Sequence, residues 1–111
     1  MTEQILSKHI TPEQLYRLDL SAINILDIRD PKEISAGGFD GSINIPFSNI
    51  FKRLDDIPSD KPVLVICRGG IVSKQIADIL ADRGYDASTL DKGYNGYRDY
   101  LDELAMEESG S

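Results

Sequence analysis

Short apolar runs alternate with amphipathic stretches along this chain. Residues 62–66 form a continuous, largely β-branched run that is typical of a buried strand, and residues 72–82 have the spacing of an amphipathic helix. Strands are predicted at residues 7–10, 23–28, 42–45, 62–66 and 86–90. Helical segments are predicted from residue 11, at 32–36, from 48 or 49 to 54, at 72–82 and at 93–104. Because strands alternate with helices, the pattern predicts an α/β fold with a small parallel central sheet and helices on both faces.

Helix-start signals support these assignments. Thr11 and Gln14 have the spacing of a capping box, and an apolar side is expected to continue through Leu15, Leu18 and Leu20. Ser48 or Asn49 is predicted to cap a short helix that carries the apolar residues Ile50, Phe51 and Leu54.

Three loops are expected to meet at one rim of the sheet. They follow the predicted strand ends Asp27, Cys67 and Leu90 and cover residues 28–31, 68–72 and 91–97. In parallel α/β sheets, ligands bind beyond the carboxyl ends of the strands. The rim is therefore where we expect a functional site.

Cys67 is the only cysteine, and it lies between the predicted central strand and the helix that follows. Backbone N–H groups at the start of a helix are unpaired, and the helix dipole is positive there, so both favour a thiolate over a thiol. Gly69 and Gly70 allow the loop to curl so that several N–H groups point at one centre. The sequence therefore predicts a cradle for a sulfur anion or an oxyanion, although a lone cysteine is more often a small buried hydrophobe.

Composition narrows the class of protein. The 111 residues suit one domain, which we assign to residues 1–106, followed by a polar tail at 107–111 that is expected to fray. The net charge of −7 disfavours nucleic acid as a partner. A single cysteine excludes an internal disulfide and a multi-cysteine zinc site. The start of the chain lacks the apolar core of a signal peptide, and no apolar run is long enough to span a membrane. We therefore expect a cytoplasmic protein without membrane contact. We also expect no metal and no cofactor.

Four stretches in this order and spacing resemble the rhodanese homology domain family, and together they cover nearly the whole chain. Residues 27–33 are similar to its D-x-R-x-x-x-E pattern, and residues 37–46 to G-H-I-x-G-A-x-N-I-P. Residues 67–73 are similar to the active loop C-x-x-G-x-x-S, and residues 90–97 to L-x-G-G-x-x-A-W. Gly38 and Tyr97 replace the usual His and Trp, and Val72 stands where many members carry Arg or another polar residue.

The resemblance implies a single-domain sulfurtransferase enzyme that moves sulfane sulfur from thiosulfate or a persulfide donor to a thiophilic acceptor. Cys67 would carry the persulfide, and the partners would be a small anionic donor such as thiosulfate or a persulfide-carrying protein. The resemblance also implies that the loop after Cys67 holds the terminal sulfur; its residues are Arg68, Gly69, Gly70, Ile71, Val72 and Ser73.

Several residues have a second interpretation. Arg68 is as well explained as a solvated charge as by a role in attracting anionic donors, and Ser73 is best explained as a helix-start residue that bonds backbone N–H groups. Asp27, Arg29 and Glu33 are expected to support the rim through ion pairs.

Two other functions compete with sulfur transfer. One is a non-catalytic interaction module or a sulfur carrier dedicated to one partner. Interaction modules often lose the nucleophile, which this chain keeps, and the carrier stays open. The other is a cysteine phosphatase or arsenate reductase. That class uses C-x₅-R, but Ser73 occupies the arginine position and the loop is short for a phosphate, so this function is disfavoured.

Overall fold

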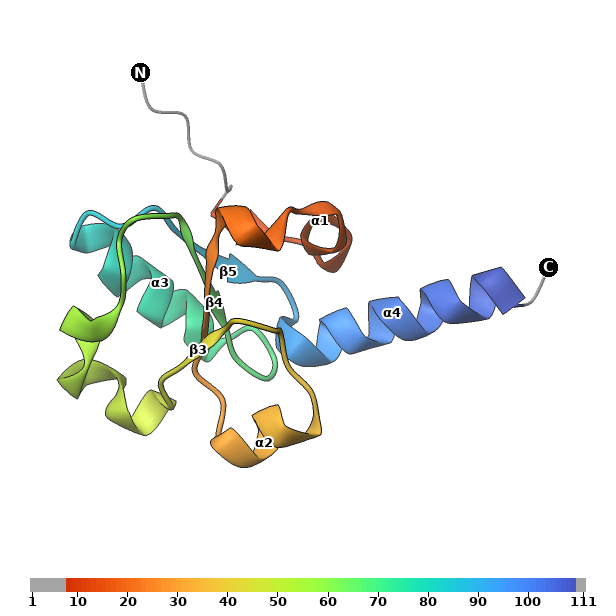
Figure 1. The fold of residues 1–111 in the computed structure, drawn as a ribbon, viewed down its shortest axis with the longest axis horizontal. Coiled ribbons are helices and arrows are strands. Elements are labelled where there is room, and N and C mark those ends of the chain that lie inside the picture. Colours follow the sequence, from red (N-terminus) through yellow and green to blue (C-terminus); the bar gives the residue numbers. More distant parts are fainter. Residues whose placement is uncertain (1–7, 110–111) are drawn as a thin grey trace, which may run out of the picture.

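The computed structural model describes residues 8–109. Five parallel strands form one sheet in the order β1-β5-β4-β2-β3, with helices on both faces, which confirms the predicted fold class (Figure 1). The strands are β1 (His9–Ile10), β2 (Asn24–Asp27), β3 (Ile43–Asn44), β4 (Val63–Ile66) and β5 (Ala87–Leu90). Ser7, the predicted start of the first strand, lies outside the described residues, as do most of the N-terminal residues considered for a signal peptide.

Alternate side chains of β4 supply two separate cores. Val63 and Val65 point to one face, where they belong to a cluster with α3 (Val72–Asp82) and two short 3₁₀ helices, Phe47–Lys52 and Leu54–Asp56. Leu64 and Ile66 point to the other face, toward α1 (Pro12–Arg17) and the start of α4 (Gly93–Ser109). All four residues of β4 are buried, because a central parallel strand is covered on both faces.

Local sequence signals account for the starts of two helices, α1 and α2 (Pro31–Ala36). Thr11 and Gln14 form the predicted capping box of α1. Asp30 caps α2 through its carboxylate, which accepts from the Lys32 N–H, so this helix begins at Pro31. The predicted cap at Ser48 or Asn49 is wrong, because the 3₁₀ helix starts after Pro46 and has no side-chain cap.

Two residues assigned to apolar faces are instead exposed. Leu20 lies in a separate 3₁₀ helix, Leu20–Ala22, and is 38% exposed, since α1 ends at Arg17. Phe51 is 59% exposed, because the tighter 3₁₀ geometry turns it away from Ile50 and Leu54, which are buried.

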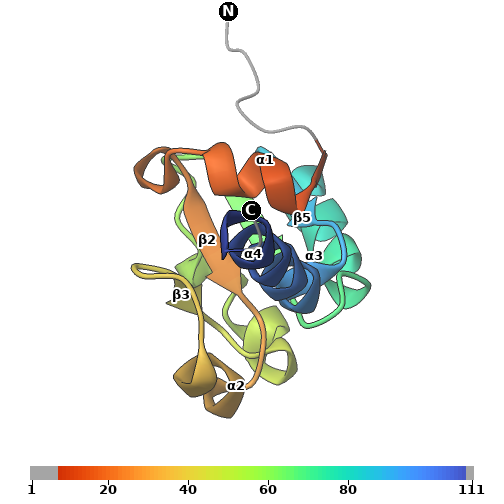
Figure 2. The same cartoon turned by 90° about the vertical axis from the view of Figure 1, so that its right-hand side faces the viewer.

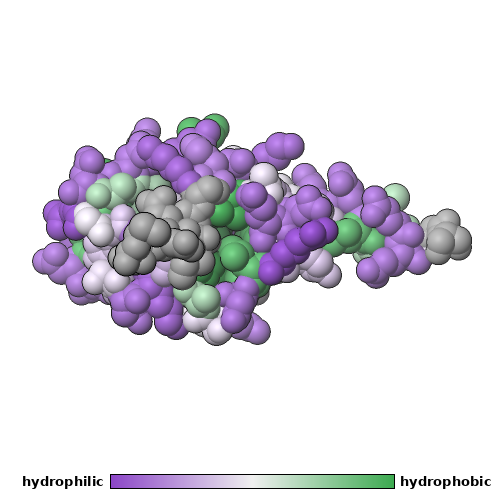
Figure 3. All heavy atoms as spheres, turned by 90° about the horizontal axis from the view of Figure 1, so that it is seen from above, coloured by the Kyte–Doolittle hydropathy of each residue, from purple (hydrophilic) through white to green (hydrophobic). Residues whose placement is uncertain are grey.

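Helix α4 leaves the body of the protein as an arm (Figures 1 and 2). Its first turns are anchored, since Tyr94 and Tyr97 pack against the core and Tyr100 stacks edge-on with Tyr16 of α1. Seen from above, the arm carries mainly hydrophilic residues with small hydrophobic patches (Figure 3). The helix extends to Ser109, so the residues 107–109 that we assigned to a frayed tail are helical, and residues 110–111 lie outside the described part.

A candidate sulfur site at the end of the central strand

Cys67 follows the last residue of β4 and is 7% exposed. It lines a cavity of about 280 Å³ whose walls come from three segments that are distant in sequence. The loop after β4 contributes Arg68 and Val72, the 3₁₀ helix contributes Phe47, and the rest comes from residues 28–33 around the start of α2. A buried thiol that lines a cavity at the carboxyl end of the sheet is accessible to a small reactive group and shielded from bulk water.

Two backbone amides donate to the sulfur of Cys67. The Gly70 N–H lies 3.1 Å from Sγ, and the Ser73 N–H, in the first turn of α3, lies 3.4 Å from it. These donors and the positive end of the α3 dipole stabilise negative charge on sulfur. The N–H groups of Gly69, Ile71 and Val72 have no hydrogen-bond acceptor within residues 8–109, so further donors remain in the same loop.

The start of α4 fixes the direction in which this loop faces. The Tyr94 N–H donates to the carbonyl of Cys67 (2.9 Å), and the Asn95 N–H donates to the carbonyl of Arg68 (3.1 Å). With its carbonyls bound on the α4 side, the loop presents its N–H groups to the thiol. The first-turn donors of one helix thus orient the loop that caps another.

Two glycines permit this close contact between the loop and α4, because neither has a Cβ. Gly70 has a φ of 86°, and an added Cβ would lie 2.8 Å from the backbone nitrogen of Lys92. Gly93 has a φ of 61°, and an added Cβ would lie 2.5 Å from the carbonyl oxygen of Arg68. Gly93 was missed as a functional position. Its signal was the glycine in the fourth matching stretch, but only the fold shows what it packs against.

Ser73 does not use its side chain as expected. Its hydroxyl is fully buried and pairs with the hydroxyl of Thr89 on β5, so it ties α3 to the sheet. The prediction that this hydroxyl bonds N–H groups at the helix start is wrong, because the side chain points inward. The residue still reaches the site, through its backbone N–H on the sulfur.

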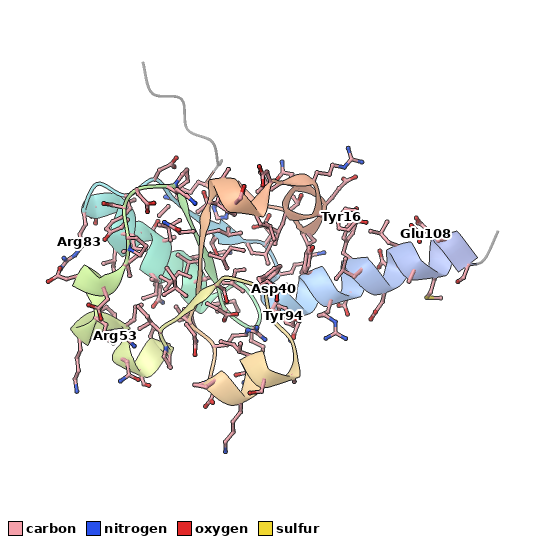
Figure 4. The ribbon with its side chains drawn as sticks, viewed as in Figure 1. Tyr16, Asp40, Arg53, Arg83, Tyr94 and Glu108 are labelled. Carbon is pink, nitrogen blue, oxygen red and sulfur yellow. The ribbon has the colours of Figure 1, made fainter. Side chains whose placement is uncertain are left out.

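A buried ion pair supports the rim beside the cavity. The Arg29 guanidinium bonds both oxygens of the Asp27 carboxylate, at 2.8–3.2 Å, and both side chains are almost fully buried. Arg29 also donates to the carbonyl of Gly37, and its guanidinium lies 3.9 Å from the centre of the Tyr94 ring. Figure 4 shows Tyr94 at the start of α4, beside the segment that leaves α2. The pair therefore links β2, α2 and α4 at the rim.

We expect Asp27→Asn to destabilise the protein by about 3 kcal/mol, because it leaves the buried Arg29 charge without a counter-ion. The measurement is the free energy of unfolding in urea. Asp56→Asn is the matched control, since it removes the partner of an exposed arginine and should change stability by less than about 1 kcal/mol. Equal losses in the two variants would contradict a structural role for the buried pair.

Arg68 is already paired. Its guanidinium makes a two-bond fork with the Glu33 carboxylate, at 2.8 and 2.9 Å, and its side chain is 68% exposed. This bond is the main reason that the pKa of Glu33 lies below its usual range. A carboxylate whose pKa is lowered by folding stabilises the fold above its ordinary pKa, and this contribution is lost as the pH falls through the lowered value. Arg68 and Glu33 thus join the active loop to α2.

No group of three or more His, Cys, Asp or Glu residues is placed to hold a metal ion in residues 8–109. Over the same range, no helix is both long enough and apolar enough to cross a bilayer.

Comparisons with known proteins show which family the chain resembles. A sequence model described as Rhodanese-like domain matches residues 11–100. The thiosulfate sulfurtransferase GlpE of Shewanella oneidensis is 30% identical over 94 residues, which are 83% of this chain and 93% of that protein. The protein of the same description from Pseudoalteromonas translucida is 33% identical, over 81% of this chain and 88% of that protein. A solved rhodanese-related protein of Thermoplasma volcanium has a TM-score of 0.78 at 28% identity and covers 85% of this chain and 93% of its own.

Proposed function

Since this chain belongs to the rhodanese-like domain family, a family of sulfurtransferases, we propose that it is an enzyme that carries sulfane sulfur on Cys67 as a persulfide. The observation that supports this most directly is the pair of N–H donors on Sγ, from Gly70 and Ser73. Amide donors favour the anionic form of a nucleophile, and an anionic nucleophile needs no general base. That fits the surroundings of Cys67, since no histidine lines its cavity.

The first step loads the cysteine. With thiosulfate as donor, the Cys67 thiolate attacks the outer sulfur, the new S–S bond forms as the old one breaks, and sulfite leaves with its electron pair. The negative charge then rests on the terminal sulfur of the Cys67 persulfide. The N–H groups of Gly69, Ile71 and Val72, which lack acceptors in the described part of the chain, are the donors that we assign to this second sulfur.

The second step removes the sulfur from Cys67. A thiophilic acceptor, such as cyanide in an assay or a thiolate in a cell, attacks the terminal sulfur and takes it away. The Cys67 thiolate leaves and returns to its two amide donors. Atoms and charge balance in both steps without an oxidant or a reductant.

Intact mass spectrometry tests this proposal. We expect the protein to gain the mass of one sulfur atom after incubation with thiosulfate or with glutathione persulfide, and to lose it on addition of cyanide. Hydrolysis of an aryl phosphate is the counter-assay, since residue 73 is a buried serine in place of a phosphate-binding arginine. Phosphate release without sulfur loading would overturn the assignment in favour of a phosphatase.

Arg68 is expected to act by neutralising Glu33. Arg68→Ala leaves that carboxylate unpaired beside the cavity, where it repels an anionic donor, so kcat/KM for thiosulfate should fall by about threefold to tenfold. The double variant Arg68→Ala/Glu33→Gln removes both charges and should recover most of the loss. If the double variant stays as slow as Arg68→Ala, the guanidinium instead binds the donor directly.

A further inference from the structure

Part of the surface around the opening above Cys67 is apolar and exposed. Phe47 lines the cavity and is 41% exposed, and its ring meets that of Phe51 edge-on at 6.1 Å between centroids. Phe51 is 59% exposed. On the loop after β4, Val72 lines the cavity, and its neighbour Ile71 is 73% exposed. We call these four residues the apolar lip.

The lip holds three of the six large hydrophobic side chains that are most exposed in the described part of the chain. Exposed aromatic residues gathered beside a reactive group are unusual on a surface that serves only small, hydrated anions. Phe and other aromatic side chains are enriched where one protein contacts another. The lip therefore provides contact area that thiosulfate, a small polar dianion, does not use.

The charged residues at the same opening also argue against thiosulfate as the preferred donor. Its two guanidinium groups are both engaged, since Arg29 is paired with Asp27 and Arg68 with Glu33. Asp30 also lines the cavity and is exposed, and within residues 8–109 it makes no ion pair. The cavity lining thus holds two carboxylates, of Asp30 and Glu33, and two guanidinium groups, so the opening has no surplus positive charge for a dianion, and Asp30 is the carboxylate that can face a cation.

From the lip and these charges we infer that the sulfur donor is a cysteine persulfide carried on a segment of another protein, with a large apolar residue and a basic residue beside that cysteine. This inference rests on the proposed function of Cys67. The apolar residue would pack on Phe47 and Phe51, and the basic residue would face Asp30.

Atoms and charge balance when a protein persulfide is the donor. The Cys67 thiolate attacks the terminal sulfur of the partner's persulfide, and a new bond forms from Sγ to that sulfur. The S–S bond of the donor breaks, the partner's cysteine leaves as a thiolate, and the hydrogen stays on the transferred sulfur. The donor brings at most one negative charge, on the transferred sulfur, and the N–H groups that we assign to that sulfur are those of Gly69, Ile71 and Val72.

Two synthetic peptide persulfides test the inference on the full chain. Each is short and has one central cysteine, flanked by Phe and Lys in the first peptide and by Ser and Glu in the second. The readout is the rate constant for sulfur loading of Cys67, followed by intact mass, with thiosulfate as a third donor. We expect the Phe/Lys peptide to load the wild-type protein about tenfold faster than the Ser/Glu peptide.

Three variants locate the origin of that preference. Phe51→Ser should remove most of it, because Phe51 contributes exposed lip area. Asp30→Asn should reduce it by about threefold through loss of the charge, since asparagine still caps α2. Tyr16→Ser is the matched control, because Tyr16 is 53% exposed and stacks edge-on with Tyr100 at 5.9 Å, on α1 and outside the cavity lining. It should leave the preference unchanged.

The results of these experiments distinguish a failure of the proposed sulfur transfer from a failure of the proposed docking surface. If neither thiosulfate nor either peptide adds sulfur to the protein, the proposed function fails and the inference falls with it. If the donors do add sulfur, but the two peptides react equally fast or Tyr16→Ser lowers the preference as much as Phe51→Ser, sulfur transfer stands and the docking surface is overturned.

Discussion

Cys67→Ser is expected to abolish sulfur loading while the fold stays intact. A serine hydroxyl does not ionise at neutral pH, so no nucleophile replaces the thiolate, and the chain has no second cysteine to take its place. The smaller Oγ can still accept from the N–H groups of Gly70 and Ser73, so the loop keeps its bonding. We expect loading to fall below detection by intact mass, a loss of at least about a thousandfold.

Thermal unfolding of the same variant is the control for its fold. Because serine keeps both hydrogen bonds, the change in stability should stay within about 1 kcal/mol of wild type. A folded Cys67→Ser protein that still gains sulfur mass from thiosulfate or a persulfide would show that the sulfur is carried elsewhere, and the assignment of Cys67 would be wrong.

Gly70→Ala should damage both activity and stability. An added Cβ would lie 2.8–3.0 Å from three backbone atoms: the nitrogens of Lys92 and Gly93 and the carbonyl oxygen of Leu90. Backbone cannot rotate aside as a flexible side chain can, and a φ of 86° is itself unfavourable for alanine. We expect a destabilisation of about 2–4 kcal/mol and a fall in the loading rate of at least about tenfold, because the N–H on Sγ moves away.

Gly69→Ala is the matched control for this prediction. It is the neighbouring glycine, an added Cβ there meets nothing within 4 Å, and its φ is not in the left-handed region. Alanine keeps the backbone N–H that we assign to the terminal sulfur, so stability and loading rate should both stay near the wild-type values. If the two alanine variants behave alike, the close contact between this loop and the start of α4 does not control the site.

The features predictable from sequence depend on local patterns. The apolar run at 62–66 located the central strand, and the Thr11–Gln14 spacing located the start of α1. The two glycines after Cys67 indicated a loop with unusual backbone angles, which Gly70 has. Each of these signals lies within a few residues of the feature that it predicts.

The features that were missed depend on partners far away in the chain. From sequence, Gly70 was expected only to let the loop curl toward the thiol, but it touches the backbone of Lys92 and Gly93, which only the folded β5–α4 turn brings near. The hydroxyl of Ser73 meets Thr89 on a neighbouring strand, so its local helix-start preference does not decide its contact. Arg68 was open to two explanations because its partner, Glu33, lies on another helix.

The inner turns of α4 should resist local unfolding more strongly than the outer turns that form the arm. Its first turns donate to the loop carbonyls of Cys67 and Arg68 and hold Tyr94 in the core, so opening them would also disturb the sulfur site. Beyond Leu104, the arm is exposed on all sides and is held mainly by its own backbone bonds. Amide hydrogens should therefore exchange with solvent quickly near Met106 and slowly near Gly96, and the outer turns can unwind without loosening the cradle around the thiol.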